Sequence, residues 1–225
     1  MISIDRSRPP ETPELPSFRL PQVGELSLPN GLSVVLVEDH RFPLVSVRLG
    51  FDAGSKYEPA ELTGLADTTA EVMPEGTGTR TAREIADAIT GIGGSIRADA
   101  SPDSMLVSGN ALSENLDQLL ELLADVVRNA AFPEEEVELR KQNRKQELLA
   151  QLSDAGYLAD ERTNALVFDG HPYARQEPTL DSIDRLDRAA VIAFRDRCLA
   201  PNKATLVLAG DFPANAVDLL QKHFG

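Results

Sequence analysis

From residue 51 to residue 79 the chain reads FDAGSKYEPAELTGLADTTAEVMPEGTGT, and this stretch decides how the elements on either side are ordered. The alternating run that ends at Phe51 indicates a strand, which Asp52-Ala53-Gly54-Ser55 breaks with turn-forming residues. A short helix is predicted over residues 63–73, and Pro74 stops it. A strand, an irregular turn and a short helix therefore follow one another here.

Outward from this stretch, paired strands alternate with helices. The run Leu44–Phe51 is expected to form a hairpin with Leu32–Val37 through the turn at Glu38–Pro43, and Asn30-Gly31 predicts a tight turn just before. Predicted strands cover residues 26–28, 32–37, 44–51, 95–100, 105–111 and 204–209, and further helices cover 81–91, 114–129, 133–153, 157–167, 188–199 and 214–224. This order predicts an α+β fold, a layered mixed or antiparallel β-sheet packed with helices, rather than a doubly wound parallel sheet.

Residues that cap helices support several boundaries. Thr81 with Glu84 has the form of a capping box, and Ser113 is placed to cap the helix over residues 114–129. That helix should bury one apolar face, made of Leu116, Leu119, Leu120, Leu123, Val126 and Val127.

Composition describes an acidic globular chain of 225 residues with a formal net charge of −14. Such a surface argues against nucleic acid and anionic membranes as partners, because both need a basic patch. No apolar run is long enough to span a bilayer, and the first residues lack the apolar core of a signal peptide. We expect a soluble chain, cytoplasmic or, if a signal has been removed, periplasmic, with the compartment left open. The one cysteine, Cys198, allows no internal disulfide and is expected to be a small buried residue.

Several segments resemble, in order and spacing, the N-terminal domain of the insulinase/pitrilysin metallopeptidases (peptidase family M16), which include the mitochondrial processing peptidases. The matching segments are Asn30–Val37, Phe51–Glu58, Gly64-Leu65-Ala66, Gly76-Thr77, Phe132-Pro133, His171-Pro172-Tyr173, Ser182-Ile183 and Pro201–Asp211. The resemblance covers residues 24–225 and leaves residues 1–23 as an extended N-terminal tail. It implies a LuxS/MPP-like metallohydrolase fold and one half of a longer two-domain subunit.

The family binds zinc through the helical motif H-x-x-E-H and a distal glutamate. Two histidines one turn apart hold the metal, and the glutamate between them activates water. The segments on either side of the motif align here without a gap. The resemblance therefore puts Asp67 and Glu71 at the histidine positions, Ala70 at the general base and Glu147 at the distal ligand.

These substitutions remove the family's chemistry. A methyl group at Ala70 cannot accept a proton, and three carboxylates suit a hard cation better than Zn²⁺. No catalytic residue is assigned, no metal or other cofactor is expected although the family uses zinc, and substrate-binding residues stay unassigned.

The resemblance then implies a non-catalytic subunit that supports peptide binding and assembly with a catalytically active zinc-peptidase subunit. Such a subunit would form a hetero-oligomer, or a self-dimer. A peptide would add to a sheet edge, for which residues 95–111 are the candidate. Two alternatives stay open: a stand-alone binding or structural protein that retains the fold, and a metallopeptidase with unconventional ligands.

If Asp67, Glu71 and Glu147 converge, two interpretations are open for them. One is a Ca²⁺ or Mg²⁺ site, and the other is a former site that faces solvent or is salt-bridged to Arg140 or Arg144. Without a cation, repulsion should raise at least one carboxyl pKa.

The histidines and one basic run are the remaining ionisable features. The three histidines, His40, His171 and His223, have no metal-ligand spacing. The basic run Arg140–Lys145 is expected to be a solvated helix face, with a contact for an acidic partner as the alternative.

Overall fold

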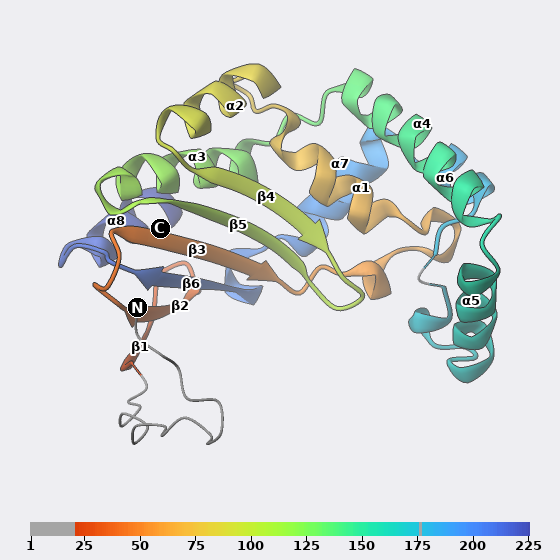
Figure 1. The fold of residues 1–225 in the computed structure, drawn as a ribbon, viewed down its shortest axis with the longest axis horizontal. Helices are drawn as coiled ribbons and strands as arrows, with labels where there is room; N and C mark the ends of the chain where they lie inside the picture. The colour runs from red at the N-terminus through yellow and green to blue at the C-terminus, as the bar shows by residue number, and fades with distance from the viewer. Residues whose placement is uncertain (1–20, 176) are drawn as a thin grey trace, which may run out of the picture.

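The computed structural model describes residues 21–175 and 177–225, and its strands form one six-stranded mixed sheet (Figure 1). The strands, in chain order, are β1 (Val23–Ser27), β2 (Ser33–Glu38), β3 (Leu44–Phe51), β4 (Ser95–Ala100), β5 (Met105–Leu112) and β6 (Ala204–Gly210). Their order across the sheet is β1-β2-β6-β3-β5-β4. The β2–β6 pair is parallel and the other pairs are antiparallel, so the predicted α+β fold is confirmed. Most of the predicted tail, residues 1–20, lies outside the described residues, and β1 begins at Val23.

Helices fill the intervals between the strands. They are α1 (Leu65–Val72), α2 (Ala82–Gly91), α3 (Leu116–Asn129), α4 (Glu134–Gln151), α5 (Ala155–Val167), α6 (Leu180–Arg185), α7 (Arg188–Cys198) and α8 (Ala216–Phe224). Short 3₁₀ turns include η1 (Ser55–Tyr57), η3 (Met73–Glu75), η4 (Ser113–Asn115) and η5 (Pro172–Arg175). None of the helices in the described ranges is long and apolar enough to cross a membrane.

The core lies between the sheet and the helices that cover one of its faces (Figure 1). Alternate residues of β3 are buried, from Val45 to Phe51, as its period of two requires. All six predicted core positions of α3 are buried as well. Helix α1 is central, because it packs against α7, β4 and α4 together.

The hairpin predicted between β2 and β3 is wrong. Strand β6 lies between them, and Leu206 is the register partner of Val34 on one side and of Leu49 on the other. The physical reason is burial: Leu206 and Leu208 have no exposed surface, so this apolar strand takes a central place. The Asn30-Gly31 turn does form, with Gly31 at φ 88°, and it joins β1 to β2.

Of the two predicted caps, one is confirmed and one is wrong. The Thr81–Glu84 capping box is present at the start of α2. Ser113 lies instead in η4, two residues before the N-cap of α3, and its hydroxyl donates to Asp211 Oδ2 at 2.9 Å. A partner distant in sequence therefore outcompetes the local capping role.

Gly54 fixes where the β4–β5 hairpin sits. The carbonyl oxygens of Ser101 and Pro102, in the turn of that hairpin, accept hydrogen bonds from the amides of Ser55 and Lys56 at 3.0 Å. A Cβ on Gly54 would lie 2.4 Å from both oxygens, so only glycine allows this approach. The contact sets the position of edge strand β4 relative to the segment that leads into α1.

Candidate functional site

Two acidic residues are the only positions of α1 that reach the surface. Asp67 is half-buried and Glu71 is exposed, one helical turn apart on one face. The other residues of α1 are buried in the core, and Ala70 is 0% exposed. The predicted site positions on α1 are therefore an accessible carboxylate pair beside an enclosed methyl group.

Glu58 caps the start of α1. Its carboxylate accepts hydrogen bonds from the amides of Gly64, at 3.0 Å, and Ala66, at 2.6 Å, and so satisfies donors that a helix start leaves free. Burial raises the pKa of Glu58 to about 7, although these two bonds favour the ionised form. Glu58 was predicted only as part of a matching segment, because its distance from the helix start fits no local capping pattern.

Arg140, on α4, lies between the two predicted ligand positions Glu71 and Glu147. Its Nη2 donates to Glu71 Oε1 at 2.9 Å, and its Nη1 donates to Glu147 Oε1 at 3.1 Å. Its Nε also contacts Glu71 Oε2. The cation that joins the carboxylates of α1 and α4 is thus a guanidinium of the chain itself.

Arg144 continues this network toward α5. It donates to Glu147 Oε2 and to Glu177 Oε2, each at 3.3 Å. The Tyr157 hydroxyl of α5 donates to the same Glu177 oxygen at 3.3 Å. Burial, followed by the Glu177 charge, raises the pKa of Tyr157 to about 12. No pattern in the sequence points to Tyr157 or Glu177 as site residues, because they come together only in the fold.

The carboxyl groups of the site titrate differently. Burial raises the pKa of Asp67 and of Glu71, while the nearby arginines oppose both shifts. Burial acts in the same direction on Glu147, but its bonds to Arg140 and Arg144 outweigh it, and the pKa of Glu147 falls below its ordinary value. The expected rise in carboxyl pKa therefore occurs at Asp67 and Glu71, and its main cause is burial rather than repulsion between carboxylates.

This donor set does not suit Zn²⁺, because it is all oxygen and a guanidinium separates Glu71 from Glu147. Across residues 21–175 and 177–225, no group of three or more histidine, cysteine, aspartate or glutamate side chains is arranged to hold a metal. The sequence left open a Ca²⁺ or Mg²⁺ site and a former site that is salt-bridged to arginines. The contacts of Arg140 and Arg144 fit the second interpretation. The absence of a bound metal stays a prediction.

The basic run on α4 is not a solvated face. Arg140 and Arg144 bond the site carboxylates, Lys141 pairs with Glu138 at 2.8 Å, and Lys145 pairs with Asp184. The Lys141 side chain is only 10% exposed. These four cations are paired within the chain, although the Lys145 side chain is still 32% exposed, and a contact with an acidic partner stays a prediction.

The histidines lie apart from the site. His40 bonds Glu38 and Asp211, His223 bonds Asp117, and His171 packs edge-on against Tyr173. Cys198 is 6% exposed, as predicted for a buried apolar residue.

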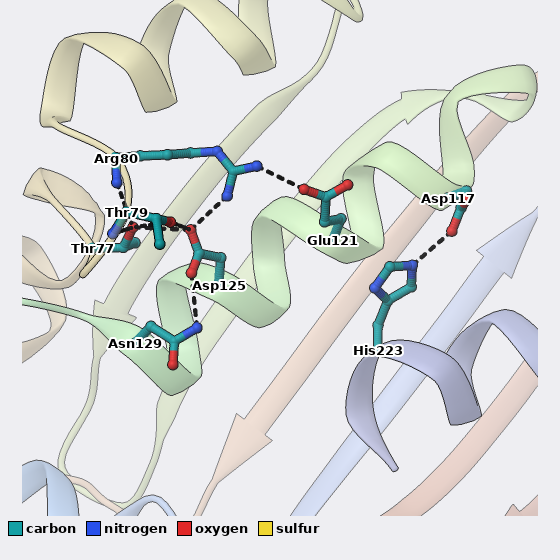
Figure 2. A network of polar contacts seen from close by, with 8 residues as sticks. All are labelled: Thr77, Thr79, Arg80, Asp117, Glu121, Asp125, Asn129 and His223. Atoms are coloured by element: carbon teal, nitrogen blue, oxygen red, sulfur yellow. Dashed lines mark hydrogen bonds and ion pairs between the residues drawn. The ribbon is translucent and has the colours of Figure 1, made fainter.

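A second polar cluster holds the loop after η3 on α3 (Figure 2). Asp125 accepts hydrogen bonds from Thr77 Oγ1 at 2.9 Å, Arg80 Nη1 at 2.7 Å and Asn129 Nδ2 at 2.8 Å. Burial raises the pKa of Asp125, but these donors outweigh it, so its pKa is lowered. Thr77, predicted only as a motif position, thus anchors the segment that follows α1.

Known proteins share sequence similarity with this chain. The model of the family described as Insulinase (Peptidase family M16) matches residues 33–176. An uncharacterized zinc protease of Mycobacterium leprae is 28% identical over 205 residues, which cover 90% of this chain and 46% of the relative. The mitochondrial-processing peptidase subunit alpha of Neurospora crassa is 27% identical over 203 residues, which cover 88% of this chain and 34% of that subunit.

A solved structure agrees with these matches. The crystal structure described as the peptidase M16 inactive domain from Pseudomonas fluorescens superposes with a TM-score of 0.84 and 26% identity, over 89% of this chain and 50% of that one. The chain therefore spans half or less of the length of these three proteins.

Proposed function

The chain belongs to the insulinase family of peptidases, family M16, and from this premise we propose that it is a non-catalytic member that supports peptide binding and assembly with a zinc-bearing peptidase subunit. One observation carries the proposal: Arg140 lies between Glu71 and Glu147, where the family resemblance puts metal ligands. Ala70, at the position of the general base, has no group that accepts a proton. Both the metal and its base are therefore replaced.

The names of two related proteins support assembly with a partner. One is a subunit of the mitochondrial processing peptidase, and one structural neighbour is described as an inactive domain. A chain that cannot activate water itself can still line part of a partner's active site and offer a sheet edge with which a peptide pairs. The active partner is then the source of zinc chemistry.

Zinc binding tests the lost site directly. After incubation with excess Zn²⁺ and desalting, the wild-type chain should retain less than about a tenth of an equivalent. The double variant Asp67→His with Glu71→His should stay poor in zinc, because the Arg140 guanidinium still lies between the ligand positions. Adding Arg140→Glu to it should raise the retained zinc to about one equivalent. The Arg140→Glu single variant is the matched control.

Two results would contradict the proposal. One is close to an equivalent of zinc on the wild-type chain that disappears when Glu71 and Glu147 are both changed to Ala. The other is peptide hydrolysis by the wild-type chain that a chelator abolishes. Either would favour the metallopeptidase with unconventional ligands.

Peptide binding is proposed at the open side of β4, the edge strand beside α1. An edge strand offers unpaired amides and carbonyls that an extended peptide can pair with. Hydrogen exchange with and without an excess of a reduced and alkylated, unfolded polypeptide should show slower exchange in Ser95–Ala100. Strand β1 is the opposite edge of the same sheet and serves as the internal control. Equal slowing of both edges would mean unspecific binding.

A further inference from the structure

The end of β6 lies beside residues 39–43, the turn that joins β2 to β3. In the parallel pair of β2 and β6, Glu38 is the register partner of Gly210, so Asp211 follows opposite the first residues of this turn. The Asp39 amide donates to the Gly210 carbonyl oxygen at 2.9 Å. The sheet order therefore brings the Asp211 carboxylate next to a turn that is distant in the sequence.

His40, in this turn, lies between two carboxylates. Its Nδ1 is 2.5 Å from Asp211 Oδ1 and its Nε2 is 2.8 Å from Glu38 Oε1, and both are hydrogen-bond distances. Asp211 Oδ2 accepts a further bond from the Ser113 hydroxyl at 2.9 Å, which fixes this carboxylate. An ionised carboxylate only accepts hydrogen bonds, whereas a neutral imidazole has one donor and one acceptor. Only the protonated ring can therefore make both bonds.

The charged groups around His40 agree with a protonated ring. Hydrogen bonds to Asp211 and then to Glu38 raise the pKa of His40 above its ordinary value of 6.5, although desolvation opposes this shift. The bond with His40 is also the main reason why the pKa of Asp211 is lowered. The other charged residues of the turn pair with each other, since Arg41 Nη2 lies 2.6 Å from Asp39 Oδ2. Three carboxylates and one guanidinium thus surround the ring.

The two bonds of His40 hold the outer part of the turn to the sheet. Within the described part of the chain, they are the only side-chain hydrogen bonds from residues 40–42 to any residue outside the turn. Phe42 is 68% exposed, and together with Asp39 it lines a cavity of about 540 Å³. The position of this part of the cavity wall therefore depends on the His40 ring.

We propose that His40 is a pH switch, which fastens the turn to the ends of β2 and β6 when its ring is protonated and releases the turn when its ring is neutral. As the pH rises through the pKa of His40, the ring loses one N–H, and one nitrogen is left facing a carboxylate with no proton between them. The stabilisation from the two bonds is therefore present at pH 6 and lost as the pH rises through the raised pKa. The inference does not rest on the proposed function, because neither α1 nor β4 takes part.

An NMR titration of the His40 ring in the full chain tests its charge. The wild-type midpoint should lie above 6.5, and Asp211→Asn should move it down toward that value. Asp181→Asn is the matched control, because it removes an exposed carboxylate on α6, at the other end of the molecule (Figure 1), and should leave the midpoint unchanged. A wild-type midpoint at or below 6.5 would overturn the inference, because the two bonds would then not favour the protonated ring.

NMR order parameters of the Cα–H groups of residues 40–42 test the release. In the wild-type chain these groups should have an S² of about 0.85 at pH 6 and below about 0.6 at pH 9. His40→Gln carries no charge and should show the low value at both pH values. His40→Lys stays charged at both and should keep the high value. His171→Gln is the matched control and should respond as the wild type does, because the His171 ring accepts from the Tyr173 amide instead.

Three results in this measurement would overturn the inference. The first is a wild-type turn with the same order parameters at both pH values. The second is a His40→Gln turn that stays as ordered as the wild-type turn at pH 6. The third is a His40→Lys turn that is as mobile as that of His40→Gln, because charge on residue 40 would then not hold the turn.

Discussion

At the scale of single residues, Gly54 shows how one missing side chain positions a strand. Replacing it by alanine would push a Cβ to 2.4 Å from the carbonyl oxygens of Ser101 and Pro102, and the backbone would have to move. We expect Gly54→Ala to lower the free energy of unfolding by about 2–4 kcal/mol in chemical denaturation. Gly78→Ala is the control, because no atom lies within 4 Å of its Cβ, and it should change stability little. Equal effects of the two would show that the hairpin contact is not tight.

Glu58 should make stability depend on pH near neutrality. Its pKa is about 7 in the folded chain against 4.5 in the unfolded one, so between these values the folded state holds a proton that the unfolded state has released. Stability should therefore fall as pH rises through this window, by up to about 3 kcal/mol from this group, and level off above it. Denaturation of wild type and Glu58→Gln at pH 5 and pH 8 measures the difference. The Glu58→Gln variant keeps Asp67 and Glu71. If its free energy of unfolding changed with pH as steeply as that of the wild type, Glu58 would not be the cause of the pH dependence.

Residue identities in the site were predictable, and Arg140 and Arg144 were among the possible ion-pair partners, but which carboxylates each arginine joins was not predictable. The family spacing identified Asp67, Ala70, Glu71 and Glu147, and the structure puts the two helices that carry them side by side. The bridging role of Arg140 depends on side-chain direction across two helices, which no spacing along one chain encodes. The capping role of Glu58 was not predicted for a similar reason, since it accepts hydrogen bonds from the amides of Gly64 and Ala66 across an intervening turn.

At the scale of elements, Asp125 joins α3 to the loop that follows η3. Its side chain is 10% exposed and accepts from Thr77, Arg80 and Asn129 (Figure 2). We expect Asp125→Ala to cost about 2–3 kcal/mol of unfolding free energy, because the buried Thr77 hydroxyl and the partly buried Arg80 guanidinium lose their acceptor at once.

Glu121→Ala is the matched control for Asp125→Ala. It removes the other partner of Arg80, but the Glu121 side chain is 53% exposed, so its loss should cost less than about 1 kcal/mol. Thermal or chemical denaturation of both variants provides the comparison. If Glu121→Ala proved the more damaging, the exposed pair with Arg80 rather than the buried cluster would anchor the loop.

Elements with strong local signals were predictable, and their neighbours across the sheet were not. The α3 core face and the Thr81 capping box follow from helical spacing alone. The place of β6 between β2 and β3 does not, because it is decided by burial against segments distant in the sequence. Ser113 illustrates the same limit, since Asp211 is its partner only after the sheet has formed.

At the scale of the whole molecule, the formal net charge of −14 acts against the folded state, because like charges are held closer together in a compact chain. Raising the ionic strength from about 0.01 M to about 0.15 M shortens the Debye length from about 30 Å to about 8 Å and screens this repulsion. The free energy of unfolding should therefore rise with salt, by about 1 kcal/mol or more. Urea denaturation at the two ionic strengths measures this change. A free energy of unfolding that falls with salt would mean that exposed ion pairs, such as Arg80 with Glu121, outweigh the repulsion between like charges.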